Sequence, residues 1–160
     1  MTEEATLVLI KPDAIQRGLA GAVYSRLEEL RLEVIGAKAV HVTRELAEEH
    51  YKALREKPFF EDLINHIEGK LNATNYVLAF VLWGDNAIGR VRHVVGATHP
   101  EKAEPTSIRG ALGRMTTAGI MENVVHSSSN SVEAEREIWL WFKPTELLRS
   151  LDFAPQRMRR

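Results

Sequence analysis

The chain has 160 residues, of which 44% are hydrophobic and 27% are charged, a balance typical of a globular domain. Its 21 basic and 22 acidic residues nearly cancel, so composition predicts no general attraction to nucleic acid or to anionic membranes. The absence of cysteine excludes disulfides, thiolate metal sites and cysteine nucleophiles. We expect one domain over residues 1–160, with a basic, weakly patterned C-terminal tail over 149–160 that frays or docks on a neighbouring subunit.

The amino-terminal stretch MTEEATLVLI is acidic, and its apolar run is short. A signal peptide has a basic region followed by a longer apolar core, so this stretch does not resemble one. No apolar run in the sequence approaches the ~20 residues that a membrane helix needs. The sequence therefore predicts a cytoplasmic protein.

Strand and helix patterns alternate along the chain. The apolar run over 5–10 predicts a strand that ends at Lys11, because Pro12 lacks a backbone donor and disfavours helix in the residue before it. The other expected elements are a helix from Leu19 to Leu30, a strand over 33–42, a helix over 44–55 capped by Thr43, a short helix opening near Pro58, a central strand over 76–83, a helix over 86–95, a long loop over 96–122, a strand at 123–127 and a final helix over 131–142.

This order of elements predicts an α/β fold of the α+β sandwich type. The specific expectation is a ferredoxin-like split βαβ arrangement, with a four-stranded antiparallel sheet covered by helices. A doubly wound parallel sheet is the alternative, because both folds alternate strands with helices along the chain.

Two local patterns suggest ligand sites but lack the residues that such sites require. The stretch GDNAIGRV (84–91) has two glycines at the spacing of a phosphate-binding loop, but Arg90 and Val91 stand where lysine and serine or threonine are needed. The stretch HVVGATH (93–99) has two histidines without a clear third ligand nearby, so surface histidines are the better interpretation.

The stretch NVVHSSSN places His126 at the end of an apolar pair, before a cluster of serines. Its neighbours leave three roles open, namely packing, metal ligation and nucleophilic catalysis. Other polar candidates also have ordinary structural explanations. Lys11 can end an edge strand, Arg92 can be a solvated helix residue, and Phe59 can be a core anchor.

Six stretches, taken together, resemble the nucleoside diphosphate kinase family. They occur in the family's order over roughly residues 5–148 and are TLVLIKPDAIQRGLAG, HYKALREKPFF, RHVVGATHP, SIRG, NVVHSS and EREIWLWF. The resemblance implies a ping-pong enzyme, in which a histidine takes the γ-phosphoryl group of a nucleoside triphosphate and passes it to a nucleoside diphosphate.

The resemblance also assigns catalytic roles to individual positions. His126 matches the nucleophile, Glu137 matches the residue that holds the second ring nitrogen, and Ser128 matches a serine beside them. The ordinary alternative for Glu137 is an exposed helix charge. The remaining catalytic matches are Lys11 and Tyr51.

By the same resemblance, the nucleotide is bound by cations, hydroxyls and one aromatic ring. The matching residues are Lys11, Arg92 and Arg109 as cations, Tyr51 and Thr98 as hydroxyls that contact phosphate, Asn123 with Lys11 near the sugar, and Phe59 as the ring that stacks on the base. Mg²⁺ is expected as the cofactor, held mainly by the nucleotide phosphates, so no protein metal ligand is assigned.

The chain departs from the family pattern in several places. Ser127 stands where glycine is usual and Ala111 where aspartate is usual, and the segments 69–76 and 110–122 are longer than the common form. The family also implies a homo-oligomer, a hexamer ahead of a tetramer, with no nucleic-acid or membrane partner. Two alternatives to a working kinase are a nucleotide-binding scaffold without turnover and a ferredoxin-like RNA-binding or regulatory domain.

Overall fold

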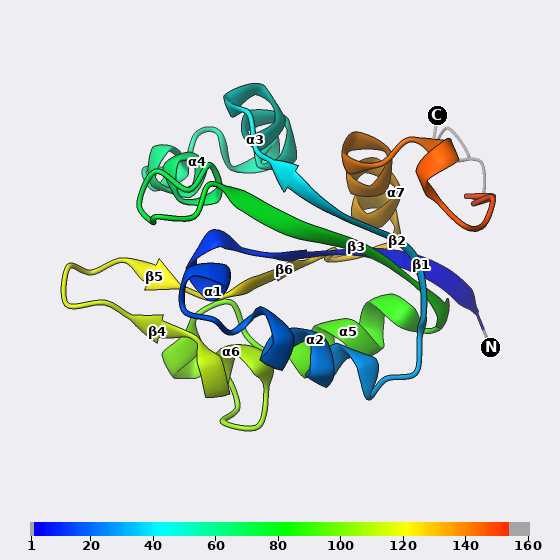
Figure 1. The fold of residues 1–160 in the computed structure, drawn as a ribbon, viewed down its shortest axis with the longest axis horizontal. Coiled ribbons are helices and arrows are strands. Elements are labelled where there is room, and N and C mark those ends of the chain that lie inside the picture. Colours follow the sequence, from blue (N-terminus) through cyan, green and yellow to red (C-terminus); the bar gives the residue numbers. More distant parts are fainter. Residues whose placement is uncertain (1, 154–160) are drawn as a thin grey trace.

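A four-stranded antiparallel sheet forms the centre of the computed structural model, which describes residues 2–153 (Figure 1). Its strands are β1 (Glu3–Ile10), β2 (Glu33–His41), β3 (Tyr76–Asp85) and β6 (Val125–Ser127). Their order across the sheet is β2-β3-β1-β6, and every neighbouring pair is antiparallel. This confirms the predicted split βαβ arrangement and excludes the parallel doubly wound sheet.

Helices cover both faces of the sheet (Figure 1). On one side lie α3 (Arg44–His50), α4 (Phe60–Ile67) and α7 (Ser131–Trp141), and on the other lie α2 (Ala20–Glu28), α5 (Ala87–Val95) and α6 (Ile108–Leu112). The short helix α1 (Pro12–Gln16) follows β1 directly. Three 3-10 turns complete the described part of the chain, at Lys52–Leu54, Pro100–Lys102 and Pro144–Glu146.

The apolar run of β1 is explained by a sheet that is buried on both faces. Leu7 and Leu9 join the core beneath α3, α4 and α7, whereas Val8 and Ile10 join the core on the α2 and α5 side. All four side chains are fully buried. Because successive side chains of a strand point to opposite faces, a strand covered on both sides is apolar at nearly every position, and the buried Thr6 is the polar exception in this run.

The predicted helix over 44–55 is wrong at its C-terminal end. The α-helix ends at His50, and the chain continues as the 3-10 turn Lys52–Leu54. The predicted N-cap is confirmed, because Thr43 Oγ1 accepts a hydrogen bond from Leu46 N at 3.2 Å.

The predicted long loop over 96–122 is also wrong, because it contains regular structure. It holds α6 and a hairpin of two short strands, β4 (Arg114–Met115) and β5 (Met121–Glu122). The hairpin projects from one end of the molecule, and Arg114 Nε donates to Glu122 Oε2 at 2.6 Å across its base (Figure 1). A five-residue helix and two-residue strands are too short to give a hydrophobic period in the sequence.

The segment that follows α7 returns to the sheet edge. Leu148 N donates to the carbonyl of Ile35 in β2, at 2.7 Å, and Arg149 forms an ion pair with Glu33 at 2.7 Å. Phe153 packs edge-on against Trp139. The first part of the predicted tail therefore packs on its own chain, and residues 154–160 of that tail lie outside the described residues.

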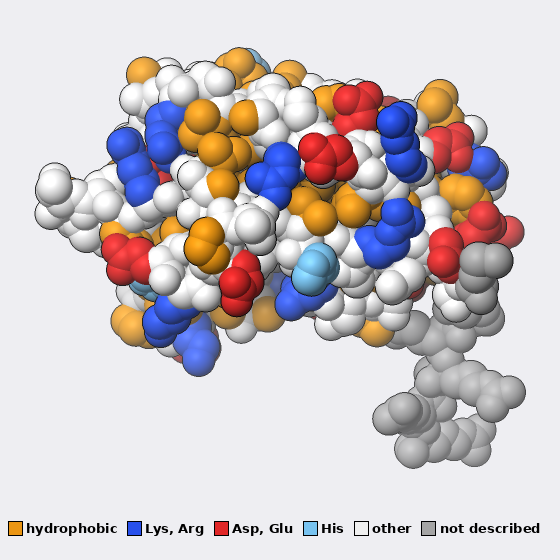
Figure 2. Space-filling view, turned by 90° about the horizontal axis from the view of Figure 1, so that it is seen from below, with side chains coloured by type: hydrophobic (Ala, Val, Ile, Leu, Met, Phe, Trp, Pro, Cys, Tyr) orange, Lys and Arg blue, Asp and Glu red, His pale blue; other side chains and the backbone are white. Residues whose placement is uncertain are grey.

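The surface below the sheet has no dominant charge. Basic, acidic and hydrophobic side chains are interspersed across the face that α2 and α5 occupy (Figure 2). This agrees with the formal net charge of −1 for the chain. None of the helices within residues 2–153 has both the length and the apolar character that crossing a membrane requires.

Candidate functional site

A cavity of about 1210 Å³ opens at the sheet end where β1 finishes, beside β6. Nine of the ten site residues expected from the sequence line it, namely Lys11, Tyr51, Phe59, Arg92, Thr98, Arg109, Asn123, His126 and Glu137. The tenth, Ser128, is fully buried, and its hydroxyl accepts a hydrogen bond from Leu7 N at 3.1 Å. Residues from distant parts of the chain thus meet around one space.

His126 lies on β6 opposite Leu9 of β1, and its imidazole faces the cavity. Its Nε2 atom lies 2.6 Å from Oε2 of Glu137, which is almost fully buried on α7. A carboxylate accepts at this distance, so the ring donates its Nε2 proton and leaves a lone pair on Nδ1. Burial raises the pKa of Glu137, but the hydrogen bond and charge of His126 outweigh burial and hold that pKa below its usual value.

A second histidine lies directly against the first, and sequence reasoning did not assign it to the site. The rings of His50 and His126 meet edge to face, with centroids 4.5 Å apart. Burial lowers the pKa of His50 well below its usual value, with the charge of His126 adding to the effect. His50 is therefore neutral, and its 3.7 Å approach to the Glu137 carboxylate is not an ion pair. The sequence offered one signal for this role, because His50 falls on the apolar face of the predicted helix over 44–55.

Two buried cations line the inner end of the cavity. Lys11 Nζ donates to Asn123 Oδ1 at 2.7 Å, and burial lowers the pKa of Lys11 to about 8. Arg109 donates to the carbonyls of Gly96, at 3.1 Å, and Val125, at 2.7 Å. Burial lowers the pKa of Arg109 to about 10. Both side chains are thus fixed in position before any anion arrives.

The outer part of the cavity is more open. Arg92 and Thr98 are exposed at its rim, and Phe59 is 47% exposed although it is large and apolar. The carbonyl of Thr98 accepts from Asn123 Nδ2 at 3.1 Å, which ties the rim to the turn before β6. Burial raises the pKa of the Tyr51 phenol, and the charge of Glu137 raises it further, so this hydroxyl remains a proton donor.

The turn that leads into β6 has an unusual backbone. Val124 has a φ of +61°, a left-handed conformation that a β-branched residue rarely adopts. Its N–H donates to Asp13 Oδ2 at 3.0 Å, and its carbonyl accepts from Lys11 N at 2.9 Å. Asp13 in turn is held by His66, whose Nε2 lies 2.9 Å from Asp13 Oδ1. Asp13 and His66 were not predicted as site residues, and they fix the turn that carries Asn123.

The two segments that the family resemblance marks as longer than the common form, 69–76 and 110–122, both contribute to the cavity. Leu71, from the segment 69–76, and residues 118–121 of the hairpin line its wall. Of the two single-residue departures, Ser127 lies within β6 and is almost fully buried, and Ser128 beside it accepts a hydrogen bond from Leu7 of β1. The two segments therefore contribute to the cavity wall, while β6, the strand that carries His126, is paired with β1.

His50, His126 and Glu137 bring donor atoms within 4.8 Å of one another, close enough for a metal. Each histidine already uses one ring nitrogen in a hydrogen bond within the protein, because His126 Nε2 donates to Glu137 and His50 Nδ1 accepts from Trp141 Nε1 at 3.0 Å. We therefore assign the cluster to a protein network and not to a metal site.

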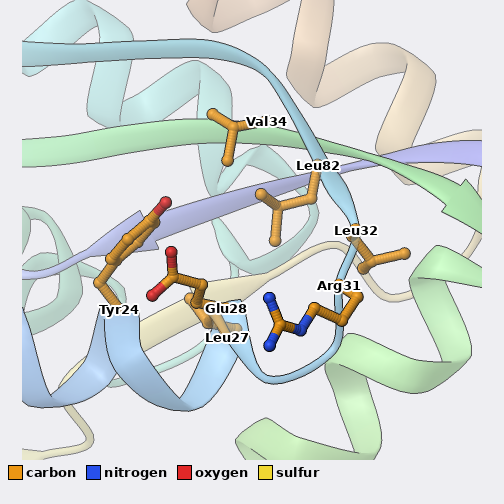
Figure 3. A pocket seen from close by; sticks show the side chains of 7 residues that line it. All are labelled: Tyr24, Leu27, Glu28, Arg31, Leu32, Val34 and Leu82. Atoms are coloured by element: carbon orange, nitrogen blue, oxygen red, sulfur yellow. The ribbon is translucent and has the colours of Figure 1, made fainter.

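A second, smaller cavity of about 330 Å³ lies between α2, β2 and β3 (Figure 3). Tyr24 and Glu28 enter it from α2, and Val34 and Leu82 enter it from the sheet. Its lining includes none of the expected site residues and no histidine, so the reactive groups belong to the larger cavity.

Comparisons with known proteins agree on one family. A family model described as nucleoside diphosphate kinase matches residues 4–147. The nucleoside diphosphate kinase of Pyrococcus horikoshii is 47% identical over 144 residues, covering 90% of this chain and 88% of the relative, and that of Staphylococcus aureus is 44% identical over 144 residues, covering 90% and 91%. A Halobacterium salinarum structure in complex with CDP has a TM-score of 0.83 at 37% identity, covering 94% of this chain and 95% of that one. A Borrelia burgdorferi structure with bound vanadate and ADP, a transition-state mimic, has a TM-score of 0.82 at 35% identity, covering 94% and 93%.

Asp13→Asn tests the clamp on the turn before β6. Burial opposes ionisation of Asp13, but the hydrogen bond from His66 and the charge of Lys11 hold its pKa below the usual value. A depressed folded-state pKa stabilises the fold above the unfolded-state pKa of about 3.9, and this stabilisation is lost as the pH falls through the folded value. We expect the substitution to lower the free energy of unfolding by about 1–3 kcal/mol at pH 7, and by progressively less below about pH 4.

The measurement is urea unfolding from pH 7 down to pH 2.5. Asp62→Asn is the matched control, because Asp62 is an exposed carboxylate of the same cavity, and its replacement should change stability by less than about 0.5 kcal/mol. An Asp13→Asn deficit of constant size across this pH range would contradict the assigned role.

Proposed function

The chain belongs to the nucleoside diphosphate kinase family, and from that membership we propose that it transfers the γ-phosphoryl group through a phosphohistidine on His126. Membership makes the chain a phosphotransferase that acts on nucleoside di- and triphosphates. The observation that supports the specific mechanism is the 2.6 Å bond from His126 Nε2 to the buried Glu137 carboxylate, beside a cavity lined by cations.

In the first half-reaction, the Nδ1 lone pair of His126 attacks the γ-phosphorus of the donor nucleotide. The bond between that phosphorus and the β,γ-bridging oxygen breaks, and its electron pair leaves with the nucleoside diphosphate. The imidazole gains positive character as the N–P bond forms, and Glu137 stabilises that charge through Nε2–H. A histidine with Nδ1 protonated could not react in this way.

Charge on the transferred group spreads over its equatorial oxygens, and fixed cations stabilise it. Lys11 and Arg109 supply these charges at the inner end of the cavity, and Arg92 supplies another at the rim. The Tyr51 hydroxyl and Thr98 add proton donors. Because Lys11 and Arg109 are already held by hydrogen bonds, little reorganisation is needed when the phosphates bind.

Mg²⁺ fits this cavity as a companion of the nucleotide. The described lining has three carboxylates, of which Glu137 and Glu133 already bind His126 and Arg136, and the exposed Asp62 alone is a poor cage for a hard divalent cation. The phosphate oxygens would therefore hold the ion, and when bound it neutralises part of their charge. Lys11, Arg92 and Arg109 would contact the remaining oxygens.

In the second half-reaction, an oxygen of the acceptor diphosphate attacks the phosphorus on His126, and the N–P bond breaks. Donor and acceptor occupy the cavity in turn, so a single base-binding surface serves both. Phe59 provides this surface through an exposed ring that can stack on any base. We further propose a cytoplasmic homo-oligomer, a hexamer in preference to a tetramer, on the strength of the family resemblance alone.

The phosphohistidine is tested by incubation with γ-labelled ATP followed by removal of free nucleotide. The wild-type chain should retain a label that is lost in acid, survives in alkali, and is discharged by any nucleoside diphosphate. His126→Ala should retain none, and its turnover should fall by more than about a thousandfold. His93→Ala, which removes an exposed histidine outside the cavity, is the control. A label that persists in His126→Ala would refute the assignment.

The pH dependence of kcat/KM tests the role of Lys11. Burial lowers the pKa of Lys11 to about 8, so in the free enzyme the cavity loses a positive charge as the pH rises through that value. We expect kcat/KM to fall above about pH 8, approaching tenfold per pH unit. Lys11→Arg keeps its charge at higher pH. The variant should have a lower kcat/KM, but the fall of kcat/KM should begin at a pH at least one unit higher than in the wild type. If the fall begins at the same pH in both, a group other than Lys11 causes it.

Phe59→Ala tests the base-binding surface. Loss of a stacking contact worth about 1–3 kcal/mol should raise KM for nucleotides at least about fivefold, with a smaller change in kcat. Leu148→Ala serves as the control, because Leu148 is 79% exposed and lies outside the cavity. Unchanged nucleotide affinity in Phe59→Ala would show that the base binds elsewhere.

A further inference from the structure

The carboxylate of Glu137 lies within reach of two imidazoles, and the mechanism above uses one of them. Its Oε2 atom is 2.6 Å from His126 Nε2 and 3.7 Å from His50 Nδ1. A small movement of the His50 ring would bring Nδ1 to hydrogen-bonding distance. Whether His50 competes for the carboxylate therefore depends on whether its Nδ1 carries a proton.

The hydrogen bond from a neighbouring tryptophan determines which ring nitrogen of His50 carries the proton. The indole Nε1–H of Trp141 donates to His50 Nδ1 at 3.0 Å, and both side chains are buried. Indole is a donor only, so Nδ1 must be the acceptor and the proton of the neutral ring must be on Nε2. That Nε2 atom has no hydrogen-bond partner although it is buried. His50 thus carries its proton on the nitrogen without a partner, which costs free energy.

Trp141 and Glu137 are four residues apart on α7, so they lie on the same face of one helix. Helix α7 therefore carries both the carboxylate that binds His126 and the indole that donates a hydrogen bond to His50. Without the indole N–H, the Nδ1–H tautomer of His50 would gain the Glu137 carboxylate as its acceptor. His126 would then share that acceptor, and more of its population would carry the proton on Nδ1 and lose the nucleophilic lone pair.

We propose that Trp141 is a positioning residue, which reserves the Glu137 carboxylate for His126 by holding His50 in its Nε2–H tautomer. The kinetic consequence rests on the proposed function of His126, whereas the tautomer of His50 does not depend on it. The step itself is an exchange of one proton with solvent between the two ring nitrogens of His50, with no change in charge.

The surroundings of His50 keep it neutral, so its tautomer and not its charge is what Trp141 controls. The groups that face it are His126 on β6, Glu137 and Arg136 on α7, Lys11 after β1, and the neighbouring Tyr51. Arg136 Nη2 also donates to the His50 carbonyl at 3.0 Å. Burial and these positive charges lower the pKa of His50, which leaves a neutral ring over the working pH range.

A double-mutant cycle tests the kinetic part. The rate of His126 phosphorylation by ATP is measured in single turnover for the wild type, Trp141→Phe, His50→Phe and the double variant. In the presence of His50, Trp141→Phe should slow phosphorylation about tenfold, within the range of coupling expected in one hydrogen-bond network. In the His50→Phe background the same change should cost less than about threefold, because no imidazole remains to compete. Equal losses in both backgrounds would overturn the proposal, because they are what a purely structural role predicts.

Nitrogen NMR of ¹⁵N-histidine-labelled protein tests the tautomer directly and needs only the wild type and Trp141→Phe. His50 should show a protonated Nε2 in the wild type and a protonated Nδ1 in Trp141→Phe. An Nε2–H tautomer that survives in Trp141→Phe would overturn the proposal even if His50→Phe does not fold. Trp139→Phe, on the exposed side of α7, is the matched control and should change neither the tautomer nor the rate.

The two readouts separate the inference from the function on which it rests. If wild-type protein takes no label on His126, the proposed function fails, while the NMR result still reports the state of His50. If the label forms but the cycle is additive, the function stands and the positioning role of Trp141 fails.

Discussion

The pairing of β6 with the end of β1 is the constraint on which the site depends. It places His126 opposite Leu9, one residue from the point where β1 ends at Ile10. Lys11, the next residue, binds the turn before β6 through its N–H to Val124 and its side chain to Asn123. A cation and a reactive imidazole are therefore held together by the strand pairing itself. A one-residue slip in this register would move the side chain of His126 to the other face of the sheet.

The site is arranged at a cost in stability. Lys11 and Arg109 are buried as cations, and burial lowers the pKa of each, which means that the free cavity disfavours their charges. Val124 adds a strained backbone, held by Asp13. A bound polyanion would remove the first of these penalties by supplying the missing counter-charge. The buried charges of Lys11 and Arg109 thus lower the stability of the fold and at the same time favour the binding of phosphate. Both charges are already in position before the phosphate binds.

Sequence reasoning succeeded where the signal is local. Pro12 marks the end of β1, and Thr43 caps α3, because each effect acts within a few residues. It failed for contacts that only the fold creates. Asp13 and His66 are 53 positions apart, and no spacing rule relates them. The roles of individual site residues came from resemblance to a family, since composition alone leaves ordinary explanations for Lys11 and its fellow candidates.

The reacting end of the cavity and its opposite wall are built from different kinds of structure. The reacting end is built on β1, β6 and α7, where each side chain is fixed by pairing or by burial. Part of the opposite wall comes from the segments 69–76 and 110–122, which are held by turns of their own and by contacts with α1 and Arg17, the residue after it. Gly69 has a φ of +81°, and a Cβ there would meet the carbonyl of Thr74 at 2.1 Å, while Thr116 N donates to Ile120 O at 2.9 Å across the hairpin tip. None of these contacts involves β6 or α7, which carry His126 and Glu137, so we expect a change in the wall that includes Leu71 to leave the bond between those two side chains in place.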